Sequence, residues 1–361
     1  MSAQRVLGRL FPPLDQKLAL RADHWSGGTA RVATRLGLQA KSCDLAAAGF
    51  SDAVGCRISG DSVARLTEEW GQRVEEQRNA EAVVANRPGQ RGERLSERRL
   101  AEVAPITTQA NISTDGAMML VREEGWKEVK VVAISAVQPQ PASARTRTSP
   151  SRRDVDVLVE LRDHSYQAGL WDADTTALHQ YAEGLRRGLD YCPKRSSVND
   201  GALWIKRITD LNYPGVPQIV DWSHAADHLW AVANAVHGDQ SPTAQTWAEQ
   251  QLDHLWNDQV VQVVAELDGL DLAQAAWPAI VQEAPDYFRS NQARMRYATF
   301  RTEGYPIGSG TVESAANTVV HHRLRRPGRG WSRENGQAML AGLSELHSGR
   351  FEYTWLRLAK N

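Results

Sequence analysis

Hydrophobic residues recur at helical spacing from residue 14 to about residue 85. The segments "LDQKLALRADHWSGGTARVATRLG", "LAAAGFSDAVG" and "SGDSVARLTEEWGQRVEEQR" each predict a helix. One face of the third carries Val63, Leu66, Trp70 and Val74, and Ser59 or Asp61 can cap its start. Residues 1–85 therefore predict a small all-α domain. The two helices around "VGCRIS" have the dimensions of a DNA-reading helix-turn-helix, but the second is acidic and ordinary helical packing is the alternative.

The pattern changes after residues 86–108, a polar, Arg-rich stretch that predicts a linker. The runs "ITTQANISTDGAMML", "EVKVVAISAVQPQ" and "DVDVLVELRD" are rich in β-branched residues and predict strands, with a basic loop "PASARTRTSPSRR" between the last two. A helix, the strand "SSVND", a second helix and the strand "PQIVD" follow. This order predicts an α/β fold with a mixed sheet of about five strands.

The remaining chain predicts helices almost throughout. Residues 109–230 would form the first part of the sheet domain, residues 231–304 a helical insertion and residues 305–361 a basic C-terminal region. Four tryptophans at helical spacing are expected in the core of the insertion: Trp230, Trp247, Trp256 and Trp277.

Composition excludes several classes of protein. The 42 basic and 43 acidic residues nearly cancel, so any nucleic-acid contact must depend on local clusters. Three scattered cysteines give neither a disulfide framework nor a CxxC zinc pair, which favours a reducing, cytoplasmic environment. The sequence contains no signal-peptide core and no apolar run of membrane-spanning length, so we expect no membrane partner.

Acidic residues follow three of the predicted strands. Asp115 is expected at the end of the first strand, and Asp200 and Asp221 at the ends of two later ones. Gly116 and Gly201 would let the chain turn away after the first two. Glu313 lies in the first turn of a helix that follows "GSG". Carboxylates that converge at one sheet edge are the ligands that Mg²⁺ prefers, and two such ions can catalyse displacement at phosphorus.

Several blocks of this sequence resemble a known family. They are "STDGAM", "NDGALWI", "IVDWSHAADHLW", "YFRSNQARMRYATFRTEGYPIGSGTVESAAN" and "HHRLRRPGRGWS". From about residue 10 to the end, the chain resembles bacterial insertion-sequence transposases of the Mutator-like DDE superfamily, in its Kra-type branch. This resemblance implies an RNase H-like catalytic core. It places the first Asp on the first strand (Asp115), the second at the close of the fourth (Asp200), and the Glu on a helix after a helical insertion (Glu313).

The resemblance also implies a reaction and its partners. Asp115, Asp200 and Glu313 would hold two Mg²⁺ ions, for which Mn²⁺ can substitute. Water would cleave the phosphodiester at a transposon end, and the freed 3′-hydroxyl would then attack target double-stranded DNA. At least a homodimer is expected on the DNA, in the cytoplasm at the nucleoid. No nucleotide cofactor is required, and no GxxxxGK[ST] loop occurs.

Asp221 and His224 match a further motif of that superfamily, an Asp or Cys that is separated from a His by two residues. Asp221 is therefore a rival to Asp200 as the second metal carboxylate, and His224 would contact the scissile phosphate or orient a carboxylate. A metalloprotease helix is disfavoured because Ala225 stands where the general base would be. A structural zinc site that includes His228 is the other alternative.

Arginines predict where a phosphate backbone would bind. The segment "HHRLRRPGRGWSRENG" has no acidic residue before Glu334, so a DNA contact is favoured over a solvated charged face. The predicted DNA-binding residues are Arg323, Arg325, Arg326, Arg329, Arg333, Arg294 and Arg296.

Relatives of this kind commonly carry a Cys-rich segment before "PLD", whereas this chain starts only a few residues earlier. One expectation is therefore a truncated or repurposed transposase-derived DNA-binding protein without cleavage activity. The presence of Asp115, Asp200 and Glu313 favours the competent enzyme, because a binding protein does not require them.

Overall fold

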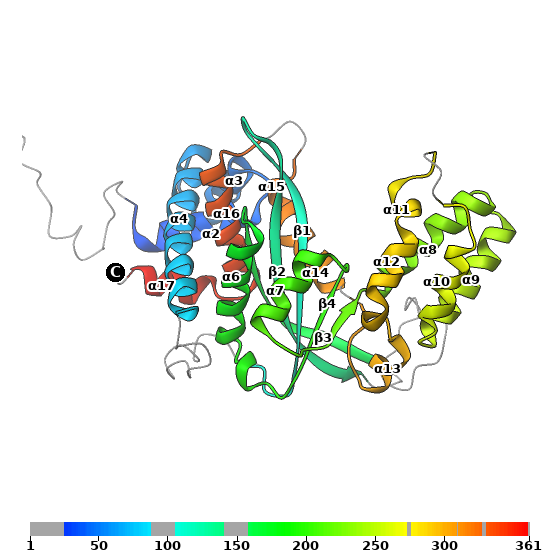
Figure 1. Cartoon of the computed structure of the whole chain (residues 1–361). Coiled ribbons are helices and arrows are strands. Elements are labelled where there is room, and N and C mark those ends of the chain that lie inside the picture. The colour runs from blue at the N-terminus through cyan, green and yellow to red at the C-terminus, as the bar shows by residue number, and fades with distance from the viewer. Residues whose placement is uncertain are drawn as a thin grey trace, which may run out of the picture.

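A five-stranded mixed sheet forms the centre of the molecule (Figure 1). The computed structural model describes residues 25–87, 105–140, 158–272, 276–308, 310–326 and 330–359. The strand order is β3-β2-β1-β4-β5. The strands are β1 Gln109–Val121, β2 Gly125–Gln140, β3 Leu158–Gly169, β4 Lys194–Asn199 and β5 Gln218–Val220. The predicted α/β class and the number of strands are confirmed.

The sheet has an antiparallel half and a parallel half. β1, β2 and β3 pair antiparallel, and the tight β1–β2 turn uses positive φ angles at Glu123 (67°) and Gly125 (79°). β4 and β5 continue the sheet parallel to β1. Parallel neighbours require crossover connections. These are supplied by α6 (Ala173–Arg186) and α7 (Leu203–Asn212).

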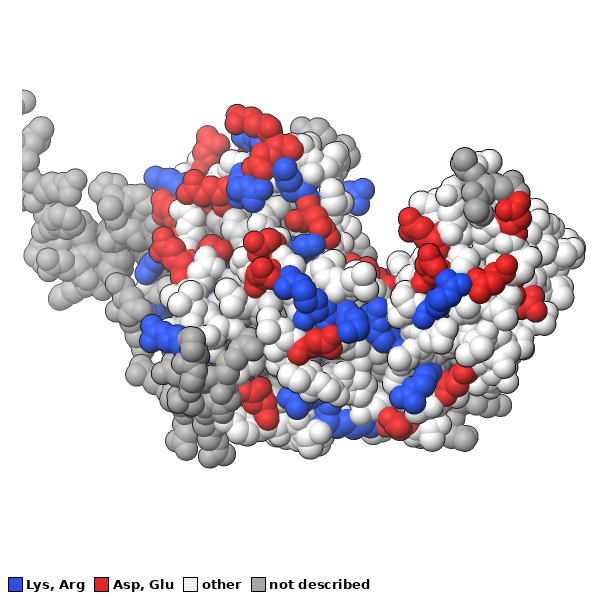
Figure 2. Space-filling view, in the orientation of Figure 1, with Lys and Arg blue, Asp and Glu red and all other residues white. Residues whose placement is uncertain are grey.

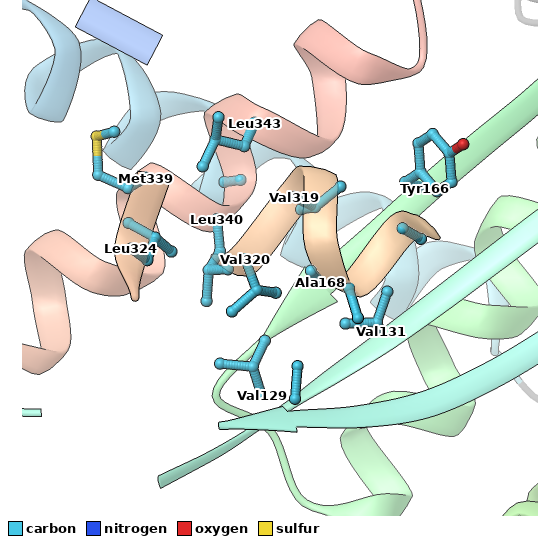
Figure 3. Close-up of a cluster of buried hydrophobic side chains, with 14 of the residues drawn as sticks. Val129, Val131, Tyr166, Ala168, Val319, Val320, Leu324, Met339, Leu340 and Leu343 are labelled. Carbon is cyan, nitrogen blue, oxygen red and sulfur yellow. The ribbon is translucent and has the colours of Figure 1, made fainter. Parts of the chain in front are cut away.

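Each face of the sheet carries its own core. On one face, Ile112 and Ile134 pack with Tyr181 and Leu185 of α6. The other face is covered by α14 (Gly310–Ala315), the π-helical segment η4 (Ala316–His321), α15 (His322–Leu324) and α16 (Arg333–His347). Figure 3 shows Val319 and Val320 above the β2 residues Val129 and Val131. Each such fully buried side chain contributes about 1.5–3 kcal/mol.

The N-terminal helices pack directly on this body. They are α2 (Gly27–Gln39), α3 (Cys43–Val54) and α4 (Gly60–Ala85), and α4 lies against α6, α16 and the C-terminal α17 (Phe351–Ala359) (Figure 1). Ser59 caps α4, as predicted, by accepting a hydrogen bond from the Ser62 amide. The predicted apolar face of α4 is buried. Ile106, in the predicted linker, is also buried, whereas the basic loop at 141–153 lies outside the described residues.

The predicted insertion is helical and lies beyond β5 (Figure 1). The first helix begins earlier than the predicted boundary at residue 231, since α8 is Trp222–His237. The other elements are α9 (Pro242–Trp256), α10 (Val260–Asp268), α11 (Ala279–Gln282), α12 (Ala284–Asn291), the 3₁₀ turn η3 (Gln292–Arg294) and α13 (Tyr297–Thr302). The four tryptophans expected in its core pack in its apolar clusters. In the part of the chain that the structure describes, no helix is long and apolar enough to cross a membrane.

Candidate functional site

Asp115 lies on β1, and Asp200 and Asp221 directly follow its parallel neighbours β4 and β5. The last β1–β4 pair is Ile112 with Ser197, and Asp115 and Asp200 each follow three residues later. Asp221 likewise follows Gln218, the residue paired with Ser197, by three positions. Neighbouring strands lie about 4.8 Å apart and in-register residues share a face. By this register Asp115 and Asp200 belong to neighbouring strands, and Asp221 belongs to the strand one farther from Asp115.

Hydrogen bonds connect these strands beyond the last β1–β4 pair. The Thr114 amide donates to Asn199 Oδ1 at 2.6 Å, and the Asp221 amide donates to the Asn199 carbonyl at 2.7 Å. On the face of the aspartates, Ser196 Oγ donates to Asn111 Oδ1 at 2.9 Å. Hydrogen bonds therefore connect β1, β4 and β5 as far as the residues next to the three aspartates.

The expectation that Asp115 ends the first strand is wrong. β1 continues past Asp115 to Val121 because its antiparallel partner β2 extends well beyond the end of β4. Gly116 is accordingly not a turn residue. It pairs with Lys130, and a Cβ at Gly116 would lie 2.0 Å from Glu128 Oε1.

Each carboxylate is oriented by a backbone amide. Asp115 Oδ1 accepts from the Gly116 amide at 2.7 Å, and Asp200 Oδ1 accepts from the Ala202 amide at 2.9 Å. Asp221 is buried, and its Oδ1 accepts from the His224 amide at 2.9 Å, which makes it the N-cap of α8. Asp221 therefore has a structural role that the sequence analysis did not assign.

Glu313 lies on α14, which packs against β1 and β2. The Ala117, Met119 and Val312 side chains lie in one cluster, so α14 covers the face that carries the aspartates. The loop before α14 reaches the start of α8, just after β5, where the Trp222 amide donates to the Ile307 carbonyl at 2.8 Å. A Cβ at Gly308 would lie 3.9 Å from Asp221 Oδ2. The Glu313 side chain is not among those that the structure describes.

The two histidines of α8 contact each other and the insertion. Their ring centroids lie 5.4 Å apart, and the His228 ring stacks on Tyr287 at 3.9 Å. Burial, together with the nearby His224, lowers the pKa of His228 to about 4, so its ring is neutral at pH 7. Among the side chains that the structure describes, no three His, Cys, Asp or Glu residues come close enough to hold a metal ion.

Two tyrosines of this site were not predicted from the sequence, and one of its arginines was predicted to bind DNA. Tyr287 Oη donates to the Asp200 carbonyl at 3.1 Å, and Tyr297 Oη donates to the Val220 carbonyl at 3.1 Å. Arg294 is buried and donates to the Gly201 carbonyl at 3.0 Å, so its guanidinium is not on the predicted DNA surface. Helical spacing places these residues on apolar faces but gives no signal that they reach the strand ends.

Gly201 is a turn residue, as predicted, with φ +97°. A Cβ there would lie 3.3 Å from Tyr287 Cε2 and 3.4 Å from Val220 Cγ2. We expect Gly201→Ala to lower the free energy of unfolding by about 1–3 kcal/mol, since both the backbone conformation and the space disfavour a side chain. Urea unfolding measures this loss. Gly215→Ala is the control, because Gly215 has φ +78° and open space. An equal loss in both variants would contradict the tight packing at Gly201.

The predicted DNA-binding arginines have different environments. Arg323 is buried and donates to the Gly37 carbonyl of α2, which removes it from the predicted surface. Arg333 forms a bidentate ion pair with Glu124 at 2.9 and 2.8 Å. Arg325 and Arg296 are exposed and Arg326 is half-buried, whereas Arg329 lies outside the described residues.

Charge on the face drawn in Figure 2 is mixed. Acidic and basic side chains alternate over the N-terminal helices, and Lys and Arg gather near the centre of the view, beside the notch that separates the sheet from the insertion. Two basic residues of α7 form ion pairs with carboxylates, Lys206 with Asp210 and Arg207 with Asp174, both at 2.7 Å.

Comparison of the sequence with models of known protein families and with curated proteins finds no match.

Proposed function

We propose that this protein is a DDE-type DNA transposase that cleaves and transfers strands at the ends of a bacterial insertion sequence, on an RNase H-like core. The observation that carries the proposal is that Asp115 and Asp200 each follow the last paired residues of the parallel neighbours β1 and β4 by three positions, and that α14, which bears Glu313, packs on β1. The order also supports it: the first Asp is on the first strand, the second follows the fourth, and the Glu comes after a helical insertion.

The donor chemistry of this set fits Mg²⁺. Asp115 and Asp200 supply carboxylate oxygens, and proteins often bind Mg²⁺ through one or two carboxylates together with waters and substrate phosphate. Such a site does not need a closed cage of three protein ligands. When bound, Mg²⁺ would activate the attacking oxygen and neutralise charge that develops on phosphorus.

The chain's own residues would then position the reactants. Asp115 and Asp200 would hold the metal beside the scissile phosphate, with their carboxylates oriented by backbone amides. Glu313 would complete the set from α14. His224, next to Asp221 at the start of α8, would approach the phosphate with an imidazole N–H, which is a suitable donor to a phosphate oxygen.

The test is incubation of the full chain with labelled duplex DNA that carries the ends of its own element, with and without Mg²⁺. Metal-dependent cleavage at the junction is the expected result. Binding of the ends without cleavage at any Mg²⁺ or Mn²⁺ concentration would contradict the proposal, and would favour a transposase-derived DNA-binding protein.

The arginine environments give a second prediction. We expect the double variant Arg325→Ala/Arg326→Ala to weaken binding to any duplex and to reduce the slope of log K against log salt concentration by about 2, one unit for each lost phosphate contact. Fluorescence anisotropy at several salt concentrations measures this. Arg323→Met is the control, because its buried guanidinium should affect stability and leave the salt slope unchanged. If Arg323→Met reduces the salt slope and the double variant does not, then Arg323, and not Arg325 or Arg326, contacts phosphate.

A further inference from the structure

Residues of the helical insertion form hydrogen bonds with the backbone at Asp200 and next to Asp221. Three buried or half-buried donors reach carbonyls at the strand ends: Tyr287 to Asp200, Arg294 to Gly201, and Tyr297 to Val220. The first two carbonyls belong to consecutive residues of the turn after β4. The insertion therefore forms a hydrogen bond with each of the two peptide groups that flank Gly201.

The central residue of this turn is a glycine, which does not itself fix the backbone conformation of the turn. Gly201 has φ +97° and no side chain, so its own conformational preferences do not fix the direction in which Asp200 points. One bond of the turn itself, from the Ala202 amide to Asp200 Oδ1, orients the carboxylate. Fixing the two carbonyls fixes the peptide planes on either side of Gly201, and with them that amide.

The donors are themselves held in place. Tyr287 stacks on His228 with ring planes 8° apart and meets Phe288 edge-on, so its hydroxyl has a defined position. A phenolic hydroxyl is protonated near pH 7, so Tyr287 Oη acts as a donor to the Asp200 carbonyl. Arg294 is buried, and desolvation of a guanidinium is costly unless its donors are used.

We infer that Tyr287 and Arg294 are positioning residues that set the geometry of the Asp200 carboxylate for a divalent cation. This inference rests on the proposed function. The helical insertion then contributes to metal binding as well as to stability. A substitution in α12 or η3 would change the metal concentration that the protein requires, although these elements need not contact DNA.

The test compares Tyr287→Phe with the wild type in the full-length chain. The variant loses the hydroxyl and keeps the ring on His228. Two readouts are needed: Mn²⁺ binding measured by electron paramagnetic resonance without DNA, and the Mg²⁺ dependence of DNA cleavage. We expect about a tenfold weaker Mn²⁺ affinity and about a tenfold higher half-maximal Mg²⁺ concentration, as for other residues that orient metal ligands. The rate at saturating Mg²⁺ should remain near that of the wild type.

Two further variants separate positioning from stability. Tyr213→Phe removes another buried hydroxyl that donates to a carbonyl, that of Gln180 at 3.4 Å, on the opposite face of the sheet. It should leave both metal readouts unchanged. Arg294→Met should weaken Mn²⁺ binding, and Arg294→Lys should restore part of it, because the ammonium group can still donate.

The outcomes distinguish the two proposals. If Tyr287→Phe matches the wild type in Mn²⁺ affinity, or if Tyr213→Phe weakens it equally, the positioning role is wrong. If the wild type binds Mn²⁺ and Tyr287→Phe binds it more weakly, but neither protein cleaves DNA, the positioning role stands and the transposase proposal fails. If the wild type does not bind Mn²⁺, both fail.

Discussion

Replacement of Asp115 or Asp200 by Asn is expected to lower Mg²⁺-dependent DNA cleavage on the order of 10³-fold, comparable to loss of a major group that stabilises transition-state charge. The amide is nearly the same size as the carboxylate and can still accept the hydrogen bond from Gly116 or Ala202. The fold and DNA binding should therefore remain. What would be lost is one of the negative charges that the proposed divalent cation requires.

Asp221→Asn is the matched control and decides between the two candidates for the second metal carboxylate. Asp221 lies one strand farther from Asp115 and caps α8, and Asn is as good an N-cap as Asp. We expect this variant to keep cleavage within about tenfold of the wild type, since it loses charge outside the Asp115–Asp200 pair. Loss of cleavage in Asp221→Asn with retention in Asp200→Asn would exchange the two roles.

Glu313→Gln tests the third carboxylate in the same assay. Loss of cleavage with unchanged DNA binding is the expected result. Retained cleavage in both Glu313→Gln and Asp115→Asn would eliminate the proposed carboxylate set. Circular dichroism of each variant shows whether a loss is chemical, because an unfolded variant would also lose DNA binding.

The local sequence predicted the elements of the fold better than their contacts. Short bounded runs rich in β-branched residues located all five strands, although β3 continues to Gly169, past the predicted end at Asp163. The apolar face of α4 was correctly identified. The sequence did not indicate that this face packs on α16, more than 250 residues away, because local periodicity shows that a face is apolar and not which surface covers it. The predicted separation of the N-terminal helices from the sheet domain therefore missed this contact.

For the candidate site, too, the sequence predicted the positions of residues along the chain better than their contacts. Asp200 and Asp221 follow strands as expected, but the length of β1 beyond Asp115 depends on pairing with β2, which no local pattern encodes. Arg323 and Arg294 were read as surface cations because arginine is rarely buried. Their burial depends on carbonyl acceptors from distant segments, such as Gly37 and Gly201. Those acceptors are identifiable only in the folded chain.

A buried ionic network gives the largest expected effect on stability. Arg350 donates to Glu183 of α6 at 2.7 Å and to Glu345 of α16 at 2.8 Å, and all three side chains are almost completely buried. Arg186 and Thr354 extend the network. It joins the crossover helix of the sheet to the C-terminal helices, on which the N-terminal helices also pack.

We expect Arg350→Met to lower the free energy of unfolding by about 3–5 kcal/mol at pH 7, because two carboxylates remain buried without their main partner. Urea unfolding followed by circular dichroism measures the loss. Arg289→Met is the matched control, since Arg289 also pairs with two carboxylates but is exposed. Its loss should be about 1 kcal/mol or less. Similar losses in the two variants would show that the network contributes no more than a surface ion pair.

The same network predicts how stability depends on pH. Burial opposes ionisation of Glu345, but the charges of Arg350 and Arg186 outweigh it and lower its pKa to about 2; Arg350 likewise lowers the pKa of Glu183 against the effect of burial. An unfolded Glu has a pKa of about 4.3. Between about pH 4.3 and 2 the unfolded chain therefore binds more protons, and the stabilisation from these groups is complete above this range and lost as pH falls through it. In Arg350→Met both folded pKa values should rise, so unfolding free energy should fall less steeply between pH 5 and 2 than in the wild type. An unchanged slope would mean that Arg350 does not hold these carboxylates in their charged form.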